Sequence, residues 1–203
     1  INVELTATER CGIQRYTFPE AEASVFLNLK KAMNWDFTLD SKIEVVDSTT
    51  IRGYRLSQGW SPLQHVYFET RFSKPFVACH MDTTSIVTKE KGWIGTAYVA
   101  RFDFNTKKDE EILVTTGISG VSMEGAGKNL RAEAPKDDFD YYQAQASANW
   151  NRQLSKIEGK SRNTDDMVKF YTALYHSMIA PTIYSDVDGS YYGPDQQIHK
   201  ADG

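Results

Sequence analysis

The chain has 203 residues, enough for one large domain or for one domain and part of a second. Its 23 Lys and Arg residues against 27 Asp and Glu residues give a formal net charge of −4, which argues against nucleic-acid binding and against a polybasic membrane surface. With 40% hydrophobic and 25% charged residues, the composition is that of a folded globular protein, and no apolar run approaches the roughly 20 residues of a membrane span.

The first two thirds of the sequence are expected to form β-strands. Short segments with alternating apolar and polar residues, rich in Tyr, Phe, Val and Thr, are separated by Gly, Pro, Asp and Ser. These segments are residues 3–7, 13–18, 24–29, 43–46, 49–56, 66–68, 75–80, 94–104 and 112–118. Because no helices alternate with them, we expect an antiparallel β-sandwich of two sheets.

After Pro135 the hydrophobic period changes from two to between three and four. From Phe139 to Ile157 this spacing predicts an amphipathic helix of about five turns. Asp137 and Asp138 precede it, where they would cap the helix and favour its dipole. The sequence therefore predicts a linker helix within residues 135–163, after a β-sandwich domain at residues 1–134.

A second helix is predicted to begin with Thr164 as its cap and to end at Pro181. It is apolar on most sides, and such a helix is expected to be surrounded by others. We therefore expect residues 164–203 to be the truncated start of a helical domain.

The two cysteines are too few for a disulfide scaffold or for a zinc site of four cysteines. Cys11 and Cys79 lie in strand-like sequence, where a buried free thiol is the common case. The sequence does not decide whether Cys11 and Cys79 form a disulfide.

The four histidines lack the spacing of a zinc hydrolase helix. His65, His80 and His176 lie in predicted strands or in the second helix, and we expect them to be structural. His199 lies in a polar segment and has no interpretation by itself.

The glycines do not form a phosphate-binding loop. Gly117 and Gly120 are interpreted as turn residues, and residues 125–128 (Gly-Ala-Gly-Lys) lack the spacing of a Walker motif. The run Asp186-Val187-Asp188-Gly189 invites a calcium interpretation, but it has glycine at position 4 and Gln197 at position 12, so a tight turn is favoured over an EF-hand loop.

Four longer segments carry a family resemblance. They are INVELTATERCGIQRYTF (residues 1–18), IRGYRLSQGWSPLQHVYFETRFSKPF (residues 51–76), NLRAEAPKDDFD (residues 129–140) and FYTALYHSMIAPTIYSDVDGSYYG (residues 170–193). They resemble glycoside hydrolase family 92, the calcium-dependent exo-acting α-mannosidases. The resemblance implies an N-terminal β-sandwich, connecting helices and an (α/α)₆ catalytic barrel, of which residues 164–203 would be the start. It also implies that this chain lacks the N-terminal part of the sandwich.

The resemblance also implies a mechanism. These enzymes invert the anomeric centre, with a Glu as general acid and an Asp as general base, and a calcium ion contacts the sugar hydroxyls. It places the catalytic pair and the calcium ligands beyond residue 203, so no catalytic residue or metal ligand is assigned to this chain, which alone is expected to be inactive. The loop that precedes the family's sugar-holding Trp-Asp motif is expected to approach the substrate, through Asp186, Asp188, Tyr192, Asp195 and His199.

The expected partners are α-mannoside glycans such as N-glycans, of the α-1,2 type, and the remainder of the catalytic domain. Neither nucleic acid nor a membrane span is expected. The resemblance implies a periplasmic or cell-surface location. Two alternatives stay open: a carbohydrate-binding β-sandwich module without hydrolase activity, and a non-enzymatic interaction domain that uses the exposed helix faces.

Overall fold

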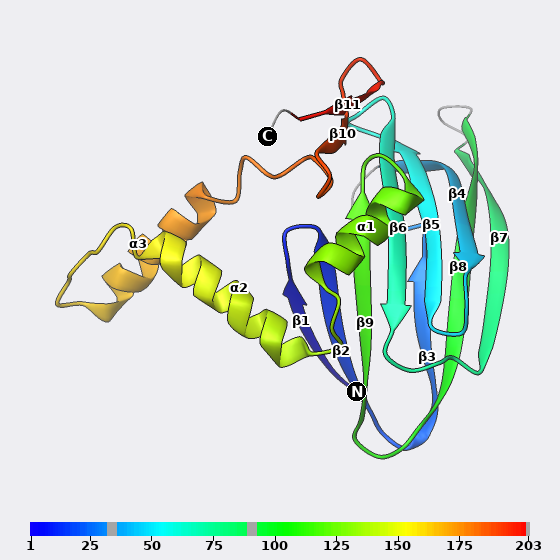
Figure 1. Cartoon of the computed structure of the whole chain (residues 1–203), viewed down its shortest axis with the longest axis horizontal. Helices are drawn as coiled ribbons and strands as arrows, with labels where there is room; N and C mark the ends of the chain where they lie inside the picture. The colour runs from blue at the N-terminus through cyan, green and yellow to red at the C-terminus, as the bar shows by residue number, and fades with distance from the viewer. Residues whose placement is uncertain (32–35, 89–92, 202–203) are drawn as a thin grey trace.

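The computed structural model describes residues 1–31, 36–88 and 93–201, and Figure 1 shows two β-sheets followed by a helical extension. All strand pairs are antiparallel. The larger sheet has the order β1 (Asn2–Ala7), β2 (Cys11–Phe18), β9 (Glu110–Ser119), β6 (Gln64–Phe72), β5 (Thr50–Gln58) and β4 (Phe37–Val45). The smaller sheet has the order β3 (Ala21–Asn28), β8 (Trp93–Thr106) and β7 (Ala78–Thr88).

The two sheets pack face to face over an aromatic core, as alternating strands of a sandwich require. Phe102 of β8 is at its centre, with ring centroids of Phe72 and Phe76 each 5.3 Å away. Phe104, Ile112 and Phe68 are buried in the same cluster. The expected fold class, antiparallel sheets with C-terminal helices, is therefore confirmed, and every predicted strand segment overlaps a strand of the structure.

A second core lies on the opposite face of the larger sheet. Here side chains of β2 and β9 meet the first two helices. The cluster consists of Cys11, Ile13, Leu113, Leu130, Ala134, Phe139 and Tyr142. One strand face thus packs against the other sheet and the other face against helices, so the larger sheet is covered on both sides in this region.

Helix α1 (Met123–Glu133) was not predicted from the sequence. Gly125 and Gly127 are unfavourable inside a helix, and residues 125–128 are interpreted from the sequence only as a run that lacks the spacing of a Walker motif. The structure supplies the reason for both glycines. A Cβ atom at Gly125 would lie 2.3 Å from Oδ2 of Asp186, and one at Gly127 would lie 2.6 Å from Oε2 of Glu69.

The interpretation of Gly117 as a turn residue is wrong. Gly117 lies inside β9, paired with Cys11 of β2 and Glu69 of β6. A Cβ atom there would lie 2.6 Å from the carbonyl oxygen of Ala126, so the glycine permits close packing of α1 on the strand. Gly120, in contrast, lies in the bend between β9 and α1.

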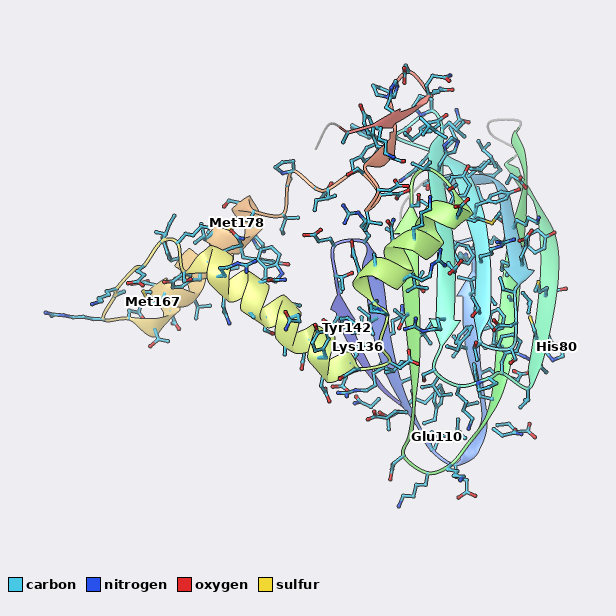
Figure 2. The ribbon with its side chains drawn as sticks, in the orientation of Figure 1. His80, Glu110, Lys136, Tyr142, Met167 and Met178 are labelled. Atoms are coloured by element: carbon cyan, nitrogen blue, oxygen red, sulfur yellow. The ribbon has the colours of Figure 1, made fainter. Side chains whose placement is uncertain are left out.

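Helices α2 (Phe139–Leu154) and α3 (Thr164–Ser177) form a helical arm that extends away from the sandwich (Figure 1). The predicted cap Asp138 accepts a hydrogen bond from Tyr141 N at 2.9 Å. The N-cap of α3 is Asn163 rather than Thr164, because the Asn163 side chain accepts from Asp165 N at 3.0 Å and Thr164 is already helical. No described residue of α3 is buried, and Figure 2 shows Met167 at the outer part of this arm.

The described helices include none that is long and apolar enough to cross a membrane. The domain boundaries at residues 134 and 163 stay a prediction, and the last two residues of the predicted third segment lie outside the described part of the chain.

Both cysteines are free thiols, so the disulfide that the sequence left open is not formed. Cys11 is buried under the helices, and this burial raises its pKa to about 11. Cys79 lies in the other sheet and packs against the inter-sheet core. The expectation of structural thiols agrees with these surroundings, since thiols buried in apolar contacts are protonated and unreactive.

Candidate functional site

The five residues predicted to lie near the substrate belong to one ordered segment, residues 185–200. After the helical arm the chain returns to the sandwich and forms the hairpin of β10 (Ser190–Tyr192) and β11 (Ile198–Lys200), which lies beside α1 and the start of β6 (Figure 1). The predicted tight turn is confirmed: Gly189 N donates to Asp186 O at 2.9 Å, and Gly189 has a φ of +83°. We call residues 185–200 the C-terminal hairpin segment.

Asp186 is buried, with 5% of its surface exposed, and both carboxylate oxygens accept hydrogen bonds from the sandwich side. Ser119 Oγ, at the end of β9, donates to Oδ2 at 2.7 Å. Asn129 Nδ2, in α1, donates to Oδ1 at 2.8 Å. Asn129 also accepts from Val187 N at 2.9 Å through its own Oδ1. A single carboxylate therefore connects the C-terminal hairpin segment to a strand and a helix.

Asp188 lies at the surface and is paired with charge. Ser190 N donates to its Oδ1 at 3.0 Å, and Lys128 Nζ of α1 lies 3.2 Å from Oδ2. The hydrogen bonds from Ser190, followed by those from Lys128, lower the pKa of Asp188 to about 2. Asp188 is consequently an anion throughout the neutral range, and it is suited to accept hydrogen bonds from sugar hydroxyls.

Tyr192 packs its ring edge-on against the imidazole of His65 at the start of β6, with 4.3 Å between ring centroids. On the same face of β6, the ring centroid of Tyr67 lies 6.1 Å from that of His65. Burial lowers the pKa of His65, which favours its neutral form. Burial also raises the pKa of the Tyr67 phenol, with a further contribution from the Tyr192 phenol. The contact between Tyr192 and His65 holds β10, the first strand of the hairpin, against the larger sheet.

Asp195 and His199 form the exposed tip of the segment. His199 Nε2 lies 2.9 Å from both carboxylate oxygens of Asp195, and its ring centroid lies 5.5 Å from that of Tyr191. The interaction with His199 is the main reason that the pKa of Asp195 is lowered. Asp195 and His199 are therefore two of the five predicted residues whose side chains contact each other and are exposed to solvent.

A third attachment joins the segment to the start of β2. Arg10 Nε donates to Ser185 O at 2.6 Å, and the same guanidinium is paired with Glu133 at the end of α1. Glu133 in turn accepts from Thr8 Oγ1 at 2.6 Å and from Arg10 N at 2.8 Å. The segment is therefore held at its beginning, at Asp186 and at Tyr192.

Sequence reasoning did not find the residues that hold the segment. Ser119, Asn129 and Arg10 carry no local signal, because their partners lie far along the chain: Asn129 is 57 residues from Asp186, and Arg10 is 175 residues from Ser185. His65 was correctly placed in a strand, but nothing near it in sequence indicates Tyr192.

The described residues do not fit the calcium ion that the resemblance implies. Asp186 uses both oxygens as acceptors for Ser119 and Asn129, and the Asp188 carboxylate forms an ion pair with Lys128. The described part of the chain contains no group of three or more His, Cys, Asp or Glu side chains placed to hold a metal. We derive no metal-dependent step from these residues.

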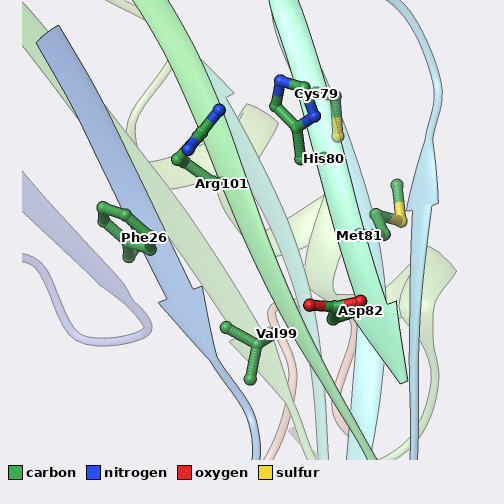
Figure 3. A pocket seen from close by; sticks show the side chains of 7 residues that line it. All are labelled: Phe26, Cys79, His80, Met81, Asp82, Val99 and Arg101. Carbon is green, nitrogen blue, oxygen red and sulfur yellow. The ribbon is translucent and has the colours of Figure 1, made fainter. Parts of the chain in front are cut away.

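Two cavities among the described residues lie elsewhere on the molecule. One of about 840 Å³ lies between the β1–β2 end of the sandwich and the helical arm, where Tyr142 and Met178 in Figure 2 belong to its lining. The other, of about 580 Å³, lies on the smaller sheet. Figure 3 shows Phe26 on β3, Arg101 on β8 and His80 on β7 around it. Neither of these two linings includes any of the five predicted residues.

Comparison with protein families matches the chain twice. Residues 1–119 match the glycosyl hydrolase family 92 N-terminal domain, and residues 125–203 match the glycosyl hydrolase family 92 catalytic domain. A search of curated proteins gives no match.

Among solved structures, the chain is similar to the family GH92 alpha-mannosidase BT3965 from Bacteroides thetaiotaomicron, with 32% identity and a TM-score of 0.83. The comparison covers 99% of this chain and 28% of that protein. A second structure of BT3965 is a complex with mannoimidazole.

Two further structures share the fold at lower identity. The GH92 family glycosyl hydrolase ccman5 is 24% identical over 99% of this chain and 27% of its own, with a TM-score of 0.78. The inverting mannosidase BT2199 from Bacteroides thetaiotaomicron is 22% identical over 97% of this chain and 27% of its own, with a TM-score of 0.82. The chain thus spans little more than a quarter of the length of these proteins.

Proposed function

Because the chain belongs to glycosyl hydrolase family 92, we propose that it forms part of an inverting exo-α-mannosidase that removes terminal mannose from α-mannosides. The observation that carries this proposal is that one chain matches the N-terminal and the catalytic domain in sequence order, and resembles an α-mannosidase over 99% of its length. We further propose the α-1,2 type, N-glycans as a natural source of substrate, and a periplasmic or cell-surface location.

In an inverting glycosidase, a general acid protonates the leaving oxygen while a general base activates water on the opposite face of the sugar. The two carboxyl groups are about 6.5–9.5 Å apart, so that the water fits between them. We place this pair in the part of the catalytic domain that lies outside this chain. The role proposed for the described residues is to fix the C-terminal hairpin segment beside the substrate.

Calcium dependence is proposed for the whole protein only. When bound, the ion supplies electrostatic stabilisation and a template for the sugar hydroxyls. The residues described here are engaged with one another, so its ligands are expected elsewhere in the protein.

The stereochemistry of mannose release tests the proposed function. The whole protein, incubated with an aryl α-mannoside and followed by proton NMR, is expected to release β-mannose first, and a chelator is expected to stop the reaction until calcium is restored. The polypeptide of residues 1–203 is expected to release none. Initial α-mannose would contradict inversion. Saturable mannoside binding without hydrolysis by the whole protein would instead support the carbohydrate-binding module.

Two carboxylates of the C-terminal hairpin segment provide a test of its proximity to the sugar. In the whole protein, Asp188→Ala and Asp195→Ala are each expected to lower kcat/KM about 10- to 100-fold, the effect of a lost hydrogen bond to a charged group. Asp109→Ala provides the control, because Asp109 lies in the β8–β9 turn at the opposite end of the sandwich (Figure 1). Unchanged kinetics in both test variants would remove Asp188 and Asp195 from the substrate site.

A further inference from the structure

The C-terminal hairpin segment depends on one buried junction. Asp186 and Asn129, 5% and 0% exposed, face each other in a space that Gly125 keeps open. Burying a carboxylate is costly unless hydrogen bonds replace its water, and here each oxygen has one protein donor. No metal or Arg is needed to explain why this carboxylate is stable where it lies.

The donors and acceptors of the junction are fixed in direction. Ser119 Oγ accepts from Val121 N at 2.9 Å and from Ser122 N at 3.3 Å, so its own proton is directed to Asp186. Asn129 Nδ2 donates to Ile118 O and to Asp186, both at 2.8 Å, and its Oδ1 accepts from Val187 N. The position of residue 186 therefore requires two acceptors and tolerates no donor.

From this geometry we propose that Asp186, Asn129 and Ser119 form a latch that positions the C-terminal hairpin segment for catalysis. Asp186 is then a positioning residue rather than a group that touches the sugar, because both of its oxygens face the sandwich side. The latch fixes the turn that begins β10, and so determines where Tyr192, Asp195 and His199 lie. This role rests on the proposed function, since it assumes that the segment serves a mannosidase site.

The fixed direction of the hydrogen bonds suggests a reciprocal substitution. Asp186→Asn must direct its NH₂ either at the NH₂ of Asn129 or at Ser119 Oγ, which already accepts two bonds. Asn129→Asp places two carboxylates 2.8 Å apart, which is unfavourable for two anions in a buried site. In the double variant, the amide introduced at position 186 can donate to the carboxylate introduced at position 129 and still accept from Ser119, while Val187 N retains its acceptor. The Ile118 carbonyl oxygen, however, loses its donor and faces a carboxylate oxygen about 2.8 Å away, so the rescue is expected to be partial.

The experiment uses the whole protein and four variants: Asp186→Asn, Asn129→Asp, the double variant, and the control Asp109→Asn. Asp109 undergoes the same change of charge in an exposed turn where its φ of 59° suits asparagine. Hydrogen–deuterium exchange of residues 185–200 reports docking of the segment, with residues 110–117 of β9, which make none of the latch contacts, as the internal reference. Steady-state kinetics on an α-mannoside report its consequence.

Each single latch variant is expected to speed exchange in residues 185–200 at least tenfold without changing that of residues 110–117, and to lower kcat/KM at least tenfold. In both measurements the double variant is expected to lie between the single variants and wild type, with slower exchange and a higher kcat/KM than either single variant. The control variant is expected to match wild type. A double variant no better than the singles would overturn the latch. Faster exchange with unchanged kinetics would overturn its positioning role. If the wild-type protein releases no mannose, the proposed function fails, and the exchange data alone decide whether the latch holds the segment.

Discussion

Replacing Phe102 with alanine is expected to lower the free energy of unfolding by about 3–5 kcal/mol, the cost of deleting a buried aromatic ring. Phe102 is 0% exposed, and it lies on the central strand of the smaller sheet, where it contacts rings from the connection and strand opposite. The surrounding rings of Phe72 and Phe76 belong to backbone fixed by both sheets, so they cannot collapse fully into the space. Urea unfolding of the full chain, followed by intrinsic fluorescence, measures the loss.

Phe26→Ala is the matched control for this prediction. Phe26 lies on the neighbouring strand β3, but it points to the outer face of the smaller sheet and is 66% exposed (Figure 3). Its removal is expected to change the free energy of unfolding by about 0.5 kcal/mol or less, since little buried surface is lost. Equal losses in the two variants would show that the described inter-sheet core does not stabilise the chain.

The strands could be predicted from the sequence because each one records its own environment. Alternation in segments such as residues 13–18 reflects a strand with two different faces, and β2 indeed directs Ile13 to the helices and Phe18 to the inter-sheet core. Asp138 could be identified as a cap because the capping bond to Tyr141 N spans only three residues. Local causes leave local signals.

Features with distant causes could not be predicted in this way. The glycines of α1 are explained by Asp186 and Glu69, which lie about 60 residues away in opposite directions along the chain, so they indicated a loop rather than a helix. The same separation concealed Asn129 and Ser119 as partners of Asp186. The segment that contains the candidate site was recognised, but its attachment to the sandwich required the three-dimensional structure.

These observations give α1 a specific place in the molecule. Glycines permit its close packing on the larger sheet, through Gly117 of β9 and through Gly127 of α1 beside Glu69 of β6. On the same helix, Asn129 and Lys128 bind the C-terminal hairpin segment. The family match to the catalytic domain begins at residue 125, within this helix. The helix is therefore one of the connections between the sandwich and the candidate site, together with Arg10, Ser119 and His65. A shift of α1 on the sheet would displace Asn129 and Lys128 from the C-terminal hairpin segment.

Gly117→Ala is expected to produce that shift and to lower the free energy of unfolding by about 3 kcal/mol, the upper end of the range for overpacking. The added methyl group would lie 2.6 Å from Ala126 O and 3.0 Å from Leu130 N, and backbone atoms of a helix cannot move aside singly. The whole helix must withdraw from β9, which loosens the second core at Leu130. Chemical unfolding measures the loss, and hydrogen exchange in residues 123–133 locates it.

Gly12→Ala separates this effect from the general cost of changing a strand glycine. Gly12 lies on β2 and follows Cys11, the residue that pairs with Gly117. A Cβ atom at Gly12 would meet nothing within 4 Å. Alanine also restricts the unfolded chain, so this variant is expected to be neutral or stabilised by about 0.4–1 kcal/mol. If Gly117→Ala were as stable as Gly12→Ala, with unchanged exchange in α1, the close approach of helix and strand would be wrong.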